Sequence, residues 1–337
     1  MKIQSTAPCR VDLAGGTLDI WPLYLYHEPA VTVNFAVDIL ARCAIETRRD
    51  NRIIMTSEDL AIEEAFDSLA DLCAATRYRL PLIAYQLRFF RPAGGLSIRT
   101  RSESPAGAGI SGSSALIIAV NSALSRLTGA GYKRERIREI SQNIESQLIR
   151  VPTGSQDYYP ALYGGVSAVE LGPAGVTRQP IPVDPAALTA RTVLAYTGEP
   201  RNSGINNWEV MKAHLDGDRK VHRNFGRIAA IAGAMRAALQ EPDWNSAGRL
   251  LREEWEHRRR NAPGISTPLI DRLVRAARRA GALGAKACGA GGGGCVFFLV
   301  DPEAKARVAS IIEREGAAVL PVKVARQGVR VAVESAE

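Results

Sequence analysis

The spacing of hydrophobic residues predicts a chain that mixes strands and helices in irregular order. Apolar, β-branched runs without a helical period are typical of strands. They occupy residues 31–45, 53–56, 96–100, 166–170 and 191–195. Apolar residues that recur every three or four positions predict helices with one buried face. Such helices are predicted at residues 80–90, 116–127 and 133–149.

The second half of the chain has a different pattern. Residues 206–280 are helical almost throughout, with a break at Pro263–Gly264. Further on, strands are predicted on both sides of a glycine loop within 286–300, a helix at 304–315, and strands at 319–324 and 329–333. This order is not the regular alternation of a doubly wound sheet, so we predict an α+β fold. Residues 173–185 hold four of the eighteen prolines and are interpreted as a domain junction.

Composition narrows the class of protein. The chain has 337 residues, 46% hydrophobic and 23% charged, which is ordinary for a globular protein with a substantial core. No apolar run reaches the ~18 residues that span a bilayer, and no cleavable leader is visible, so we expect a cytoplasmic protein without membrane contact. The five cysteines include no Cys-x-x-Cys pair and are expected to be thiols.

The net charge of +8 is concentrated in residues 252–260 and 272–279. Such runs can bind nucleic acid. Acidic residues interrupt these runs and no aromatic residues accompany them, so we interpret them as solvated helix faces and expect no nucleic-acid partner. Positive charge would still attract anionic substrates. The four histidines are scattered along the sequence, and we therefore do not expect zinc.

Residues 104–115, Ser-Pro-Ala-Gly-Ala-Gly-Ile-Ser-Gly-Ser-Ser-Ala, carry the clearest chemistry. Small residues let a backbone turn tightly against a ligand, and the helix that follows offers unpaired N–H groups to an anion. No Gly-Lys-Ser/Thr ends the stretch, so it is not a Walker A loop. A flexible connector would lack the flanking strand and helix. We predict a nucleotide-phosphate loop, with contacts from Pro105, Gly107, Gly109, Ser111, Gly112, Ser113 and Ser114.

Three motifs together resemble those of the GHMP kinases. Residues 104–115 are similar to the phosphate loop of that family, with Ile110 in place of the usual Leu. Residues 7–16 resemble its first motif and residues 284–295 its third. The resemblance implies a two-domain fold, with an N-terminal domain over 1–180, a C-terminal domain over 181–337 and the active site in the cleft between them. A monomer or a homodimer is expected.

Details of these motifs are most similar to the D-glycero-D-manno-heptose 7-phosphate kinases. Residues 13–19 resemble their Leu-Ala-Gly-Gly-Gly-Thr-Asp, with Thr17-Leu18 in place of Gly-Thr. Residues 154–157 resemble their Gly-x-Gln-Asp segment, although Tyr158 follows where Gln is usual. Residues 197–203 resemble their Thr-Gly-x-x-Arg segment. The departures at Thr17, Leu18 and Tyr158 affect which sugar is expected as the substrate, and they do not affect the assignment as a kinase.

The resemblance also implies roles for individual residues. Glu145, with the hydroxyl of Ser114, would bind Mg²⁺. Asp157 would act as general base, and Arg10 would orient it or neutralise phosphoryl charge. Contacts to the substrate are expected from Gly16, Asp19, Arg201, Gly291 and Gly292. Without the resemblance, each of these could equally be an ordinary surface, turn or cap residue.

These inferences predict an ATP- and Mg²⁺-dependent kinase that phosphorylates a hydroxyl of a sugar or sugar phosphate. Heptose 7-phosphate and its anomeric hydroxyl fit the resemblance best. The alternatives are a kinase for galactose, fucose or another sugar or polyol, a catalytically inactive sugar sensor of the same fold, and a decarboxylase of the mevalonate diphosphate type. The joint presence of Arg10, Ser114, Glu145 and Asp157 argues against a sensor.

Overall fold

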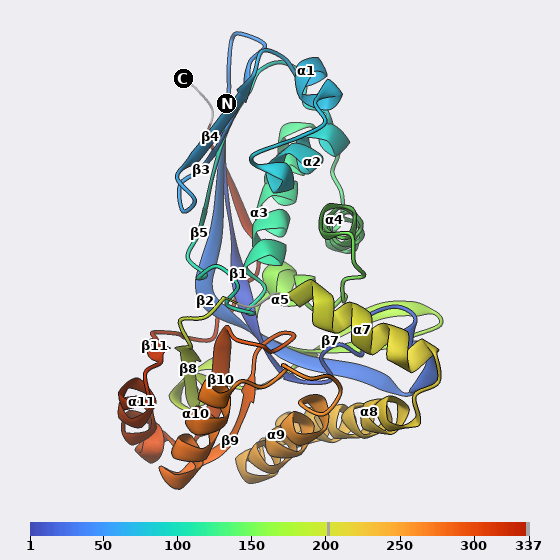
Figure 1. Cartoon of the computed structure of the whole chain (residues 1–337). Helices are drawn as coiled ribbons and strands as arrows, with labels where there is room; N and C mark the ends of the chain where they lie inside the picture. The colour runs from blue at the N-terminus through green and yellow to red at the C-terminus, as the bar shows by residue number, and fades with distance from the viewer. Residues whose placement is uncertain (201–202, 335–337) are drawn as a thin grey trace.

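The computed structural model describes residues 1–200 and 203–334, and they form two sheets covered by helices (Figure 1). The larger sheet has eight strands in the order β12-β1-β2-β5-β3-β4, while β6 pairs with β2 and β7 pairs with β6. All pairs are antiparallel except β3–β5. The strands are β1 (Lys2–Ala14), β2 (Ala30–Thr47), β3 (Ile53–Ser57), β4 (Ile62–Phe66), β5 (Leu96–Ser102), β6 (Val166–Gly172), β7 (Gly175–Ile181) and β12 (Arg330–Glu334).

The long strand β2 runs through both halves of the molecule. One end, residues 41–47, pairs with β5, whereas the other end, residues 30–35, pairs with β6. Its neighbour β1 follows it over nearly the whole length, with register shifts at Pro8/Cys9 and Asp12/Ala14. Such irregularities bend a strand and redirect its side chains. Arg10 and Asp12 lie between these two shifts.

Helices cover one face of the upper part of this sheet (Figure 1). The central one, α3, buries an apolar face against β1 and β2, and the buried hydroxyl of Ser5 donates to the Ala119 carbonyl at 2.6 Å. The helices α2, α4 and α5 pack against α3, and α1 packs on α2. The five helices are α1 (Leu69–Ala74), α2 (Pro81–Phe90), α3 (Gly112–Leu127), α4 (Arg134–Ile149) and α5 (Tyr158–Tyr163).

The smaller sheet is antiparallel, in the order β11-β8-β10-β9. Its strands are β8 (Thr192–Tyr196), β9 (Ala282–Ala287), β10 (Cys295–Val300) and β11 (Ala318–Leu320). The remaining helices are α6 (Pro185–Ala190), α7 (Ser203–Leu215), α8 (Arg219–Gln240), α9 (Trp244–Arg258), α10 (Pro268–Arg279) and α11 (Lys305–Arg314), with short 3₁₀ turns η1 (Leu23–Tyr26) and η2 (Pro302–Ala304). The helices α9, α10 and α11 pack on the smaller sheet, whereas α8 packs on α9 and on β1 and β2 of the larger sheet, and α7 packs on α8 and η1. Among the described residues, no helix combines the length and apolarity needed to cross a bilayer.

The predicted α+β class is confirmed, and most predicted elements are present. The interpretation of residues 173–185 as a junction is wrong in part, because β7 lies within them and pairs with β6. Pro180 is tolerated there because β7 is an edge strand. The division after residue 180 stays a prediction. It falls at the end of β7, while β12 returns from the C-terminus to the first sheet.

Candidate active site

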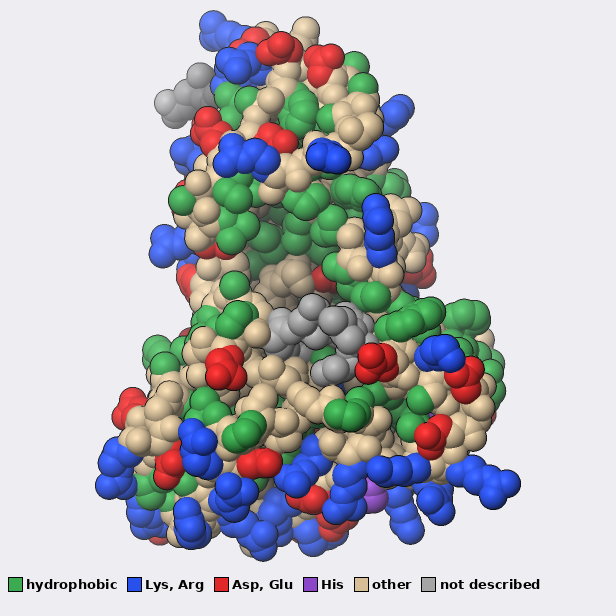
Figure 2. All heavy atoms as spheres, viewed as in Figure 1, with side chains coloured by type: hydrophobic (Ala, Val, Ile, Leu, Met, Phe, Trp, Pro, Cys, Tyr) green, Lys and Arg blue, Asp and Glu red, His purple; other side chains and the backbone are tan. Residues whose placement is uncertain are grey.

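A cleft of about 420 Å³ lies where the phosphate loop faces the ends of both sheets. Its lining includes residues 104–109 and 111–114, the side chains of Arg10, Asp19 and Asp157, and the backbone at Gly289–Ala290. Figure 2 shows the surface hollowed between the upper and lower parts of the molecule. Segments far apart in the sequence therefore meet around one cavity.

The phosphate loop is held from both sides by main-chain hydrogen bonds. The amide of Arg10 in β1 donates to the Ile110 carbonyl at 3.0 Å, and that of Cys295 in β10 donates to the Ala108 carbonyl at 2.7 Å. Gly294, at φ +76°, leaves no room for a side chain, because a Cβ there would lie 2.7 Å from the Ala108 oxygen. The third glycine motif thus supports the loop.

The start of α3 is suited to an anion. Ser111 occupies the N-cap position at φ +60°, its side chain accepts no hydrogen bond from the first turn, and its buried hydroxyl has no partner among the described residues. Unsatisfied N–H groups and the positive end of the helix dipole favour negative charge at this place. The loop and helix therefore fit the phosphates of a nucleotide.

Glu145 projects from α4 toward the same helix start. It accepts hydrogen bonds from the hydroxyls of Ser113 at 2.7 Å, Ser114 at 3.1 Å and Tyr158 at 2.6 Å. Glu145 is buried and forms no ion pair with Lys or Arg in the described part of the chain. Burial, with the nearby Asp157 adding to it, raises the pKa of Glu145 above its ordinary value. A buried carboxylate beside two hydroxyls and lacking a counter-charge fits a divalent cation.

Asp157 occupies the N-cap of α5 but caps nothing with its side chain. Instead its Oδ1 accepts from Arg10, from Nε at 2.9 Å and from Nη2 at 2.6 Å. The Asp157 side chain is 29% exposed, whereas that of Arg10 is 3% exposed. Burial opposes the charge of Arg10, but Asp157 and Asp12 outweigh it and raise its pKa. A permanently charged guanidinium therefore fixes a carboxylate at the cleft.

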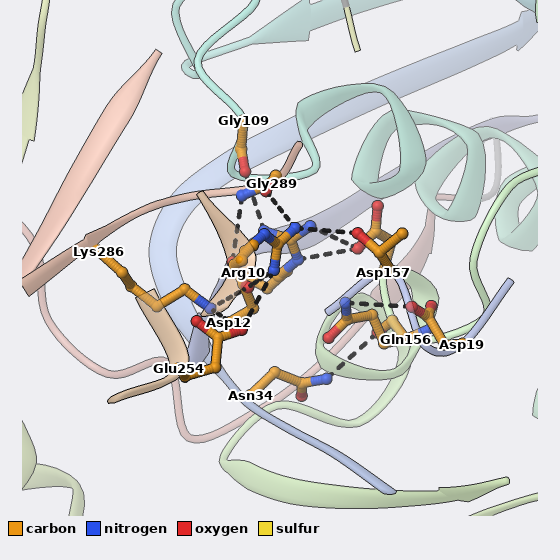
Figure 3. Close-up of polar contacts among 12 residues, drawn as sticks. Arg10, Asp12, Asp19, Asn34, Gly109, Gln156, Asp157, Glu254, Lys286 and Gly289 are labelled. Atoms are coloured by element: carbon orange, nitrogen blue, oxygen red, sulfur yellow. Dashed lines mark hydrogen bonds and ion pairs between the residues drawn. The ribbon is translucent and has the colours of Figure 1, made fainter. Parts of the chain in front are cut away.

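Asp19 lies beside this pair but is bound differently. Its Oδ2 accepts from the Gln156 amide at 2.9 Å, and its Oδ1 accepts from the Gln156 side chain at 3.4 Å (Figure 3). Burial, and then the charge of Asp157, raises the pKa of Asp19 to about 6. Gly154 permits this arrangement, because a Cβ there would lie 2.0 Å from Asp19 Oδ2.

Behind the cleft lies a buried ion network (Figure 3). The Nζ of Lys286 donates to Asp12 Oδ2 at 2.7 Å and to Glu254 Oε1 at 3.0 Å, and all three side chains are 0% exposed. Arg258 donates to the same two carboxylates at 3.3 and 3.4 Å. The other oxygen of Asp12 accepts from Arg10 at 3.3 Å. With Asp157 the network balances three cations against three anions.

The cations of the network keep Asp12 ionised. Burial alone would raise the pKa of Asp12, but Lys286, Arg10 and Arg258 hold it far below its ordinary value. Asp12 also accepts from the Gly289 amide at 3.2 Å, and Arg258 donates to the Gly289 carbonyl and to Thr17 Oγ1 at 3.2 Å. Both glycine-rich motifs at the cleft are therefore attached to the same set of charges.

Comparison with known proteins agrees with this geometry. The model of the GHMP kinases N-terminal domain matches residues 73–165, and that of the GHMP kinases C-terminal domain matches residues 235–318, together just over half of the chain. The chain belongs to the GHMP kinase family. It is accordingly a phosphotransferase that acts on an alcohol group, in a fold whose members use ATP as phosphate donor.

Individual relatives span the whole chain. The D-glycero-alpha-D-manno-heptose 7-phosphate kinase of Campylobacter jejuni is 27% identical over 97% of this chain and 98% of its own. The mevalonate kinase of Thermococcus sibiricus is 26% identical over 98% of each chain. The solved structure of a D-glycero-D-manno-heptose 1-phosphate kinase from Bacteroides thetaiotaomicron is similar with a TM-score of 0.77, at 22% identity over 99% of this chain and 100% of that chain, which establishes the fold alone.

The GHMP kinase site contains two charges that the sequence analysis misinterpreted. Arg258 and Glu254 fall in the basic run taken as a solvated helix face, but both are buried. Their spacing could have indicated burial, because Leu251, Glu254 and Arg258 follow the helical period and lie on the buried face of α9. Lys286 lies in the third motif and was given no role.

The other residues predicted to contact the substrate lie in different parts of the structure. Arg201 lies outside the described residues. Gly16 packs against Arg258 and Asp12. Gly291 and Gly292 pack against the Ile265 carbonyl, whereas Gly289 and Ala290 line the cleft. Substrate contacts by Gly16, Gly291 and Gly292 stay a prediction.

Two departures from the heptose-kinase pattern have a structural account. Thr17 adopts φ +74°, the left-handed backbone that glycine favours, and its hydroxyl is bound by Arg258. Tyr158 is fully buried and donates a hydrogen bond to Glu145, so its side chain lies beside that carboxylate and not in the open cleft.

Proposed function

We propose that this GHMP kinase transfers the γ-phosphoryl group of ATP to the anomeric hydroxyl of a sugar phosphate, with D-glycero-D-manno-heptose 7-phosphate as the substrate. The observation that carries the proposal is the Asp157–Arg10 pair, which opens into the same cleft as the uncapped start of α3. The full-length similarity to the Campylobacter heptose 7-phosphate kinase supports the choice of substrate.

The acceptor side of the reaction rests on Asp157. Both N–H groups of Arg10 engage Oδ1, and Oδ2 accepts no hydrogen bond within the described part of the chain. Oδ2 is therefore the atom that takes the hydroxyl proton as the acceptor oxygen bonds to the γ-phosphorus and ADP leaves. Arg10 orients the Asp157 carboxylate, while Asp19 and Gln156 supply hydrogen-bonding groups for further sugar hydroxyls.

The donor side rests on the loop and Glu145. Backbone N–H groups at the start of α3 hold the phosphates. Glu145 with Ser113 and Ser114 would hold Mg²⁺, which when bound neutralises charge on the transferred group. Arg201 is proposed to grip the phosphate already present on the sugar, because a planar guanidinium binds phosphate in bidentate fashion.

A coupled ADP-release assay over sugars and sugar phosphates tests the proposal. We expect turnover with heptose 7-phosphate that stops in excess EDTA, and at most weak turnover with galactose, fucose or mevalonate. Turnover only with unphosphorylated sugars would contradict heptose 7-phosphate as the substrate and would favour a kinase for galactose, fucose or another free sugar. Absence of ADP release with every acceptor, in a protein that binds ATP, would favour a sensor instead.

A further inference from the structure

Three of the four histidines meet outside the cleft, although one of them, His27, lies 187 residues before the next. His27 follows η1, His214 lies in the last turn of α7, and His222 lies in the first turn of α8. One ring nitrogen from each lies within 4.8 Å of the others. Scattered histidines gave no reason to expect zinc, but η1, α7 and α8 bring three of them together.

The spacing of these nitrogens suits a single metal ion. The Nε2 atoms of His27 and His214 are 2.7 Å apart, and the rings of His214 and His222 stack with centroids 3.8 Å apart. Imidazole nitrogens bound to Zn²⁺ at 2.0–2.1 Å in a tetrahedron are roughly 3.3 Å from each other. That separation lies between the 2.7 Å of the close pair and the 4.8 Å limit of the cluster, so only small side-chain movements are needed.

The protein leaves part of this cluster unsatisfied. His214 is 1% exposed, and its buried Nδ1 has no hydrogen-bond partner among the described residues. Between His27 and His214 a single proton can be shared. Phe225 stacks on His27, and Tyr26 lies against both other rings, so aromatic side chains flank the three imidazoles. Burial lowers the pKa of His27 and brings that of His214 to about 4, and neutral imidazole is the form that binds metals.

We propose that His27, His214 and His222 form a Zn²⁺ site, with water completing the coordination. Three imidazoles without a carboxylate or thiolate match Zn²⁺ and the neighbouring first-row metals such as Cu²⁺ and Ni²⁺, and they disfavour Mg²⁺, which prefers oxygen ligands. The ion would fasten η1 to the α7–α8 corner. Asp19 in the cleft lies four residues before η1 begins. An ion bound at the end of η1 would therefore help to fix the position of the loop that carries Asp19.

Metal titration of the full, tag-free chain tests this proposal. After removal of metals with a chelator, the chain is titrated with Co²⁺ and followed by visible absorption, and Zn²⁺ stoichiometry is measured after gel filtration. We expect one ion per chain and the intense bands of low-coordinate Co²⁺. His27 and His222 are half-buried, so both can be replaced. The variants His27→Asn and His222→Asn should each lower the affinity for Zn²⁺ by more than ~100-fold, since loss of a residue that only hydrogen-bonds to a ligand already lowers metal affinity about 10–100-fold.

Two matched controls separate this site from others. His257→Asn removes the one histidine outside the cluster and should leave binding unchanged. Glu145→Gln alters the Mg²⁺ position in the cleft and should also retain the zinc. Zn²⁺ should raise the Tm of the wild type and of both controls but not of the cluster variants. Substoichiometric binding by the wild type, or equal binding by His222→Asn and His257→Asn with circular dichroism unchanged, would overturn the proposal.

Discussion

The phosphate loop and the buried ion network lie side by side at the cleft, yet they are built in opposite ways. The loop presents main-chain N–H groups and short hydroxyls from one continuous stretch, residues 104–115. The network joins six charged side chains from β1, α5, α9 and β9, including the wholly buried Lys286. The loop depends on local backbone geometry, whereas the network depends on charges that only the complete fold brings together.

This contrast has consequences for each region. A loop that binds through its backbone is displaced when an added side chain contacts it, and this displacement should weaken nucleotide binding alone. A balanced buried network fails when one charge is removed, because its partners are left uncompensated in a medium of low polarity. Arg10 and Asp157 connect the two, since the network ends at the carboxylate we assign as base.

The largest effect is expected for Asp157→Asn. Asn retains the size and the contact with Arg10 but cannot take the proton, so kcat should fall ~10²–10⁴-fold. Nucleotide affinity, measured by isothermal titration with a non-hydrolysable ATP analogue, should stay within a few-fold of the wild type. If single-turnover rates fall less than tenfold, Asp157 is not the base.

Next in size is Lys286→Met, which tests the network directly. Asp12 and Glu254 would lose one of the two cations that they share, at fully buried positions, and removal of one partner from a buried ion pair typically costs about 3–5 kcal/mol. Urea denaturation should show this loss in the free energy of unfolding. The exposed Lys220→Met serves as control and should differ from the wild type by less than ~0.5 kcal/mol. Equal stabilities of the two variants would mean that the network does not depend on its charge balance.

The ionisation of Asp19 gives a pH-dependent prediction. Because its pKa is about 6 in the folded protein and near 4 when unfolded, the folded state binds the extra proton between these values. Stability from this group is therefore lost as the pH rises from 4 to 6. Relative to Asp19→Asn, the wild type should lose up to ~3 kcal/mol over this range and nothing further above it. A constant difference between the two proteins across pH 4–7 would contradict the assigned shift.

A smaller effect is expected in the loop, from Gly294→Ala. The added Cβ meets the Ala108 carbonyl and should push the loop out of position, at a cost of ~1–3 kcal/mol. Gly264→Ala is the matched control, because its φ of +81° carries a similar backbone penalty and nothing lies within 4 Å of the new Cβ. The KM for ATP should rise for Gly294→Ala alone. Parallel behaviour of the two variants would show that only backbone strain is at work.

How much the sequence could predict follows from the same contrast. The loop, its flanking strand and helix, and the positions of Ser113, Ser114 and Asp157 follow from local pattern and motif, and the structure brings them to one cleft. Two cations bound to Asp12, Arg258 and Lys286, are separated from it by more than two hundred residues, and no local pattern joins them to it. The helical spacing of Glu254 and Arg258 could have marked them as buried, but the mixed charge of the run favoured a solvated face.

Neither the histidine cluster nor the left-handed backbone of Thr17 could be predicted from the sequence, because both depend on contacts between distant segments. His27 comes close to His214 and His222 only because η1 packs on the α7–α8 corner. Thr17 takes a backbone conformation that its β-branched side chain disfavours, and the bond from Arg258 helps to hold it there. Both features arise from tertiary contacts that overrule local preference.

Phosphorus-31 NMR of the reaction product tests the central claim most directly. Heptose 7-phosphate, ATP and Mg²⁺ are incubated with the wild type and, in parallel, with Asp157→Asn. The account predicts a new phosphate resonance coupled to the anomeric proton, formed in step with ADP by the wild type and absent with the variant. Phosphate transferred to another hydroxyl, free phosphate without a sugar product, or the same product from Asp157→Asn at an undiminished rate would contradict it.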